Sequence, residues 1–280
     1  MKKFLCTLVL AVALVSCGKK DDGIHPLGSR EKQLESATVQ TVKETVTEEE
    51  TSEEETPPKA VRKNISEDSD PVIVDVPYYS QEKYPTGCEL VSTSMVLAFY
   101  GFDIKAGDIV KKGYLKSAEL HNKDKKLYGA DPEKVFIGNP DKHSGYGCMS
   151  GAVILALQRF LTPQEYISGD RYEIKDLGGM WLDEICEEYI DNGVPVIVWC
   201  SINMNPTFIN LRNSWIIEGT GERYIWKSNE HCLVLTGYDS ENYYFNDPLV
   251  RKNTSYKKCI AERRYMEMGM QAVAVEKVSP

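Results

Sequence analysis

Histidine is scarce in this chain of 280 residues, which contains only His25, His121, His143 and His231. The sequence also has no CxxC pair and no cluster of cysteine and histidine at the spacing of a zinc site, so we expect no metal and no other cofactor. Neither a basic stripe nor an aromatic stacking platform is present, which argues against nucleic acid as a partner. The chemistry must therefore come from the side chains themselves.

Long apolar runs are missing too, apart from one of about a dozen residues near the N-terminus, which is short for a bilayer that needs roughly 20. Two lysines precede this run, and it ends in Leu14-Val15-Ser16-Cys17-Gly18. The segment 1–17 resembles a bacterial lipoprotein signal peptide with its lipobox. The resemblance implies that Cys17 becomes the lipidated first residue and anchors the protein on the extracytoplasmic face of the cell membrane. An ordinary secretory leader and an uncleaved membrane anchor are the alternatives.

Much of the negative charge is concentrated in one segment of the chain. The formal net charge is -9, and seven glutamates lie between Lys43 and Glu55. The segment 18–70 has few aliphatic residues and almost no aromatic ones, so it cannot bury enough apolar surface to offset its chain entropy. We expect an acidic, disordered tether there.

A change of composition at Pro71 marks the start of a single domain, 71–280. We expect helices first and antiparallel strands later, an α+β arrangement. A long polar stretch, 122–147, is expected to be a loop. The expected helices are 88–100, one or two short ones in 105–120, 148–161 and 179–190, and the expected strands are 72–76, 171–175, 194–199, 224–226, 232–238, 243–245 and 271–275.

Cys88 is the candidate nucleophile. Thr86 and Glu89 have the spacing of a capping box, which predicts that Cys88 lies in the first turn of a helix. Free backbone N–H groups and the helix dipole favour a thiolate at that place. The capping box would also occupy Glu89 and keep its charge away from the sulfur.

His231 is the candidate general base, because it opens the most apolar strand of the second half of the chain. The next strand ends in Asn246-Asp247-Pro248, and a turn near residues 239–242 predicts a hairpin. Such a hairpin brings Asp247 back toward His231, where a carboxylate could fix the tautomer of the imidazole.

Gln81 completes the expected site. Its side-chain N–H and the backbone N–H of Cys88 could together form an oxyanion hole. Cys148 is the competing nucleophile, since it also opens a predicted helix, but it lacks a matching upstream glutamine. Among the other cysteines, Cys232 is expected to be a core thiol on its strand, and Cys186 is expected within an amphipathic helix.

Taken in order, these motifs resemble the bacteriocin-processing, double-glycine peptidase-like branch of the papain-like cysteine peptidases. The resemblance covers residues 71–280 and implies a papain-like fold in which a buried nucleophile helix packs on an antiparallel sheet. It assigns the nucleophile to Cys88, the base to His231, the orienting carboxylate to Asp247 and an oxyanion donor to Gln81. The chain has no P-loop, so it resembles a stand-alone peptidase and a Gly-Gly preference is not assumed.

Three functions follow as hypotheses. The first is an extracytoplasmic, membrane-anchored cysteine peptidase acting on a peptide or protein substrate. The second is an amidase or isopeptidase that uses the same residues on cell-wall stem peptides. The third is a non-catalytic binding lipoprotein on the same fold. The sequence does not define the oligomeric state.

Overall fold

A computed structural model describes residues 70–278 of the chain. The expected signal peptide, Cys17 and the tether up to residue 69 lie outside the described residues. None of the helices in the described range has the length and apolarity needed to cross a membrane.

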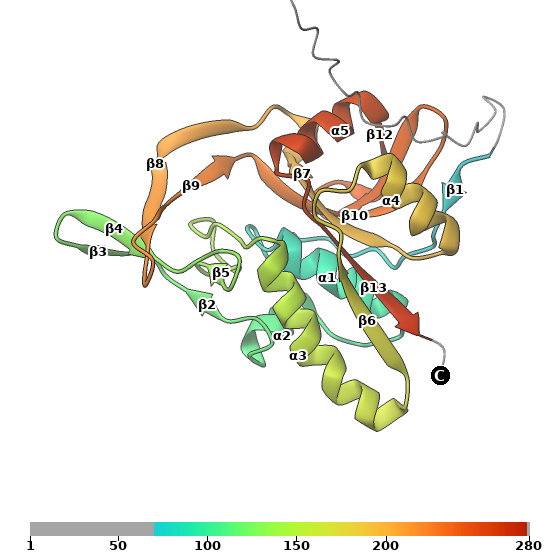
Figure 1. The fold of residues 1–280 in the computed structure, drawn as a ribbon, viewed down its shortest axis with the longest axis horizontal. Helices are drawn as coiled ribbons and strands as arrows, with labels where there is room; N and C mark the ends of the chain where they lie inside the picture. The colour runs from blue at the N-terminus through green and yellow to red at the C-terminus, as the bar shows by residue number, and fades with distance from the viewer. Residues whose placement is uncertain (1–69, 279–280) are drawn as a thin grey trace, which may run out of the picture. The chain divides into compact units, whose positions relative to one another are not determined.

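The core of the molecule is a seven-stranded sheet in which every pairing is antiparallel. Its order is β12-β11-β10-β7-β13-β6, and β1 pairs with β10 outside this path (Figure 1). Its strands are β1 (Val72–Ile73), β6 (Arg171–Asp176), β7 (Val196–Ser201), β10 (Glu230–Tyr238), β11 (Asn242–Asp247), β12 (Arg251–Lys257) and β13 (Ala272–Val278). Every residue of β7 and β10 is buried, so helices must cover both faces of these strands.

Helices do cover both faces (Figure 1). On one side, α1 (Cys88–Phe99) packs on β10, and α3 (Ser150–Ser168) packs on β6 and β13. On the other side, α5 (Lys258–Glu267) packs on β7. Ten of the twelve residues of α1 are buried, as expected for a helix that is apolar nearly all round. The shorter helices are α2 (Ala106–Lys111) and α4 (Leu182–Glu188).

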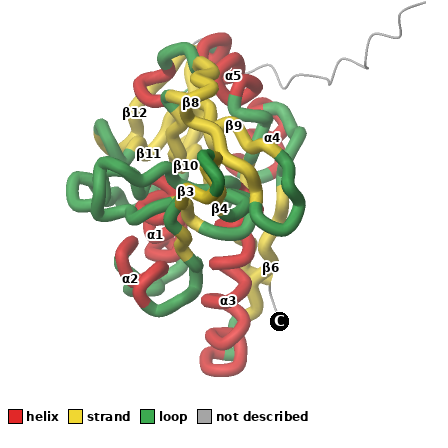
Figure 2. The backbone as a smooth tube through the Cα atoms, turned by 90° about the vertical axis from the view of Figure 1, so that its left-hand side faces the viewer, coloured by secondary structure: helices red, strands yellow, loops and turns green. Residues whose placement is uncertain are grey.

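A second sheet lies beside the central one and has the order β3-β4-β8-β9. Figure 2 views the molecule from this side, with β3 and β4 toward the reader. Its strands are β3 (His121–Lys123), β4 (Lys126–Gly129), β8 (Phe208–Ile217) and β9 (Arg223–Ser228), and a separate pair is formed by β2 (Ser117–Ala118) and β5 (Phe136–Ile137). Strands β4 and β5 and most of β3 fall in 122–147, so the prediction of a plain loop there is wrong.

The α+β class predicted from the sequence is confirmed, and several boundaries need correction. Helix α3 begins at Ser150 rather than at Cys148 and continues past Pro163. The strand expected at 72–76 is only two residues long. Strands β8 and β12 and helix α5 were not predicted, because their many polar residues hide the period of their apolar ones.

Candidate active site

Cys88 is the first residue of α1, as predicted, but the capping box is not formed. The residue that caps the helix is Gly87, which has no side chain to accept a hydrogen bond. The hydroxyl of Thr86 donates instead to the carbonyls of Asn139 and Lys142, at 3.4 and 3.1 Å. Thr86 therefore fastens the 139–142 loop rather than the helix.

Glu89 turns inward instead of capping. Its Oε1 accepts the backbone N–H of Cys148 at 2.5 Å, and its Oε2 accepts the Cys88 thiol at 3.4 Å. The side chain is fully buried, and burial raises the pKa of Glu89 to about 7. A Cβ on Gly147 would come 2.2 Å from Oε1, so only glycine leaves room for this carboxyl.

Glu230, the first residue of β10, faces the same place and was not singled out in the sequence. One carboxylate oxygen each from Glu230 and Glu89 and the Cys88 sulfur all lie within 4.8 Å of one another. Burial, together with the nearby Glu89, raises the pKa of Glu230 well above its usual value. The sequence did contain one signal for it. Side chains alternate along a strand, and this period of two places Glu230 on the same face as the apolar residues Cys232 and Val234.

These surroundings raise the pKa of the Cys88 thiol, whereas the sequence led us to expect a lowered pKa. Burial raises the pKa of the Cys88 thiol well above its usual value, and the carboxyls of Glu230 and Glu89 raise it further. The first turn of a helix favours a thiolate. In this conformation, burial and the two acids outweigh that effect, so Cys88 is a protonated thiol at neutral pH.

His231 and Asp247 are brought together, as the predicted hairpin requires. Nε2 of His231 lies 2.8 Å from Oδ1 of Asp247, and both side chains are 1% exposed. Asp247 also accepts the N–H of Leu249 at Oδ1 and the hydroxyl of Tyr256 at Oδ2. Burial alone would raise the pKa of Asp247, but the hydrogen bonds from His231, Leu249 and Tyr256 and the nearby His231 lower it below its usual value.

Cys88 and His231 do not meet directly in this conformation. The side chains of Glu230 and Cys232, the two neighbours of His231 on β10, both raise the pKa of the Cys88 thiol and therefore lie on its side of the strand. Because side chains alternate along a strand, His231 points to the opposite face, toward Asp247. Within residues 70–278, the thiol is hydrogen-bonded to Glu89 and not to the His231 ring. His231 is the second residue of β10 and follows Glu230, whose carboxyl lies beside the Cys88 sulfur at the start of α1.

Gln81 is held in the loop before α1 and is 2% exposed. Its backbone N–H donates to the carbonyl of Pro248, which follows Asp247, at 3.0 Å. Its side-chain Nε2 donates to the carbonyl of Pro85 at 3.4 Å, and its Oε1 has no hydrogen-bond partner in the described part of the chain. The backbone thus ties Gln81 to the end of β11.

The remaining cysteines in the described range are free, like Cys88. Cys148 is completely buried, and burial and Glu89 raise its pKa well above the usual value. Its backbone N–H is already used by Glu89, and its carbonyl accepts the indole N–H of Trp199 at 3.0 Å. Cys148 therefore has a packing role in this structure. Cys186, Cys200 and Cys232 are likewise buried.

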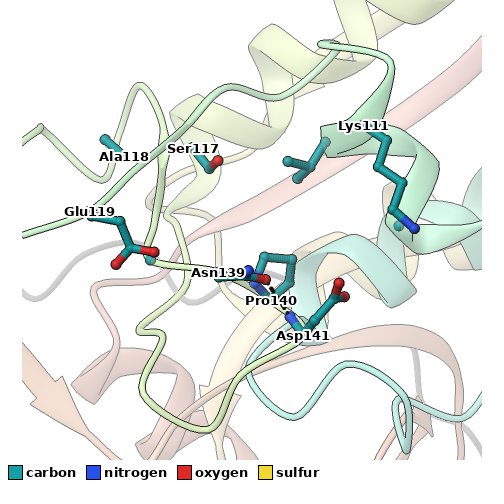
Figure 3. A pocket seen from close by; sticks show the side chains of 10 residues that line it. Lys111, Ser117, Ala118, Glu119, Asn139, Pro140 and Asp141 are labelled. Carbon is teal, nitrogen blue, oxygen red and sulfur yellow. Dashed lines mark hydrogen bonds between the residues drawn. The ribbon is translucent and has the colours of Figure 1, made fainter.

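Two cavities flank the region. One of about 310 Å³ lies between α2 and the loop at 138–141, where Lys111 stands opposite Glu119 and Asp141 (Figure 3). The other, of about 480 Å³, lies between the loop at 78–84 and α1. Neither is lined by any of the four predicted site residues, whose side chains are all at most 5% exposed.

Comparison with known proteins gives a consistent answer. The sequence profile of the Peptidase_C39 like family matches residues 73–273. The uncharacterized protein YvpB of Bacillus subtilis (strain 168) is 27% identical over 207 residues, which are 73% of this chain and 76% of YvpB. The crystal structure of a presumed C39-like peptidase from Bacillus anthracis is 25% identical, with a TM-score of 0.61, and the match covers 76% of this chain and all of that one.

Proposed function

Since the chain belongs to the Peptidase_C39 like family, we propose that it hydrolyses peptide bonds with Cys88 as nucleophile, His231 as general base and acid, and Asp247 as the carboxylate that orients the histidine. The observation that carries the proposal is the buried hydrogen bond of 2.8 Å between His231 and Asp247. Asp247 occupies Nε2 and thereby leaves Nδ1 of the ring for a thiol.

The reaction begins with a change at the sulfur. A rearrangement at the start of β10 brings together the Cys88 sulfur and the His231 ring, which do not meet in this conformation, and Cys88 then gives its proton to Nδ1 of His231. The sulfur then attacks the substrate carbonyl carbon, and the carbonyl oxygen becomes an oxyanion that accepts hydrogen bonds from the Cys88 backbone N–H and the Gln81 side chain.

The second half returns the enzyme to its starting state. His231 passes the proton to the leaving amine as the C–N bond breaks, which leaves a thioester on Cys88. Water, deprotonated by His231, attacks the thioester and releases the carboxylic acid and the free thiol. Asp247 stabilises the imidazolium in both steps and does not itself become protonated.

The proposal also includes a cellular location for the protein. Lipidation at Cys17 would anchor the domain on the extracytoplasmic face of the membrane, so the substrates would be exported peptides or proteins. This part rests on the lipobox Leu14-Val15-Ser16-Cys17. Radioactive palmitate supplied to bacteria that express the chain should label wild type and not Cys17→Ala.

Hydrolysis is tested with a library of linear peptides and with cell-wall stem peptides, by mass spectrometry of the products. The full chain should cleave a subset of the peptides, and Cys88→Ala should abolish cleavage. Cys148→Ala is the matched control, because it removes another buried thiol and should leave cleavage measurable. Cleavage that survives in Cys88→Ala would refute the assignment.

A further inference from the structure

The cluster of Cys88, Glu89 and Glu230 is unusual because it places two buried carboxyls and a thiol together with no compensating cation. No ion pair joins either carboxyl to lysine or arginine within residues 70–278. Buried acids stay protonated, pair with a cation or coordinate a metal. With no lysine or arginine beside them, Glu89 and Glu230 can both be ionised only when a cation from solution joins the cluster.

Glu230 gives the strongest indication. Its side chain is 8% exposed, and its Oε1 is buried without any hydrogen-bond partner among the described residues. The backbone around it is fixed, since Glu230 pairs with Ser201 at the end of β10 and β7, two strands in the interior of the sheet. An orphaned acceptor at such a fixed position calls for an explanation, and a bound ion is one of the few available.

We propose that Cys88, Glu89 and Glu230 form a binding site for a thiophilic divalent cation of the Zn²⁺ class, and that the ion holds the Cys88 sulfur in an inactive state. Binding of the ion displaces to solvent the thiol proton and the protons that the two carboxyls carry, and the thiolate and the two carboxylates become three ligands. The inhibitory part rests on the proposed function, whereas ion binding itself does not.

Distances support the site. With Zn–S of about 2.3 Å and Zn–O of about 2.1 Å, two ligand atoms at a tetrahedral angle are about 3.6 Å apart. Cys88 Sγ and Glu89 Oε2 are 3.4 Å apart, and all three ligand atoms lie within 4.8 Å of one another. Only small side-chain movements would bring Glu230 to the ion.

Neighbouring groups hold the ligands in place. The backbone N–H of Cys148 fixes Oε1 of Glu89 and thereby directs Oε2 to the sulfur. A hydrogen bond of this kind to a ligating carboxylate is the usual outer-shell support of a metal site. The sulfur ligand favours Zn²⁺ over Mg²⁺ and Ca²⁺, which prefer oxygen alone. The sequence prediction of no metal rested on ligand spacing, and these ligands are two adjacent residues plus one from a distant strand.

The test uses the full chain, freed of metal with a chelator, and probes it with Co²⁺ and Zn²⁺. We expect Co²⁺ to give a thiolate-to-cobalt absorption band, and we expect Zn²⁺ to bind with one-to-one stoichiometry in competition with a chromophoric chelator. Glu230→Gln keeps the size of the side chain and should weaken Zn²⁺ binding by about tenfold or more. Cys88→Ala should remove the cobalt band. Glu222→Gln, which changes an exposed acid, should bind like wild type.

The outcomes separate the two proposals. If Glu230→Gln and wild type bind Zn²⁺ equally while circular dichroism shows both folded, the metal site is refuted even if peptides are cleaved. If Zn²⁺ binds as expected but the metal-free chain cleaves nothing, the site stands and the peptidase proposal fails. If both hold, Zn²⁺ should stop cleavage in wild type, a chelator should restore it, and Glu230→Gln should need more Zn²⁺ for the same inhibition.

Discussion

The hydroxyl of Tyr256 donates a hydrogen bond of 2.9 Å to Oδ2 of Asp247, the carboxyl oxygen that His231 leaves free. Tyr256 lies on β12 and Asp247 at the end of β11, so adjacent strands position the carboxylate from one side while β10 supplies the histidine from the other. The orientation of the imidazole thus depends on three neighbouring strands.

Tyr256→Phe should lower the free energy of unfolding by about 2 kcal/mol, because it removes a hydrogen bond to a charged, buried group. Urea denaturation measures this loss. Peptide cleavage should also slow, because the Asp247 carboxylate is less firmly held. Tyr244→Phe is the matched control, since Tyr244 makes a similar bond of 2.7 Å to Asp239 in a turn away from the site. Equal effects of both variants on cleavage would contradict a positioning role for Tyr256.

Asp247 should make stability depend on pH in the acidic range. Its pKa in the folded protein is lowered, so its contribution is fully present above the unfolded value of about 3.9 and disappears as the pH falls through the folded value. The difference in unfolding free energy between wild type and Asp247→Asn should therefore shrink below about pH 4. Denaturation at a series of pH values measures it, and a difference that stays constant would show that the lowered pKa is absent. Cleavage by Asp247→Asn should fall by about 10²- to 10⁴-fold.

Glu89→Gln should make the Cys88 thiol more reactive. The substitution removes one of the two ionisable carboxyls that raise the pKa of Cys88 and keeps an oxygen for the Cys148 N–H. In the presence of a chelator, iodoacetamide should alkylate Cys88 faster than in wild type at neutral pH, as followed by peptide mass spectrometry. Exposed Cys259 serves as the internal reference within each sample. A slower or unchanged rate at Cys88 would mean that Glu89 does not restrain the sulfur.

Gly147→Ala tests the space around Glu89. Gly147 has a φ of +136°, and a Cβ there would lie 2.2 Å from Oε1 of Glu89. Backbone strain of this kind costs about 1–3 kcal/mol, and displacement of the carboxyl should add to it. Gly101→Ala is the control, because Gly101 also has a positive φ, of +87°, but has open space around it. Thermal unfolding should show a larger loss for Gly147→Ala, and two equal losses would contradict the contact.

The sequence predicted the pairing of His231 and Asp247 because a hairpin with a short turn leaves little freedom of register. It also predicted that Cys88 lies in the first turn of α1. It failed for Glu89, because the spacing of Thr86 and Glu89 is equally compatible with a capping box and with an inward side chain. Which of the two forms is decided by the Cys148 N–H, 59 residues away, and no local pattern carries that information.

Glu230 was missed for a related reason. An acid beside a histidine at the start of an apolar strand resembles the solvent-exposed end of that strand. Only the tertiary structure shows that this end lies beside Cys88 at the start of α1 and that the carboxyl is buried. Strand β8 and helix α5 were missed because their burial depends on partners that are distant in sequence.

Strand β1 has a mechanical consequence. The described chain enters the domain through Val72 and Ile73, which pair with Tyr238 and Gly237 at the far end of the strand that carries His231. Gly237 permits this approach, since a Cβ there would lie 2.2 Å from the Val72 carbonyl. A force applied to the chain ahead of Val72 would load this two-residue pairing first. Because β1 is so short, its pairing with β10 would break before the force was transmitted along β10. The position of His231 would therefore not be disturbed by tension on the preceding chain.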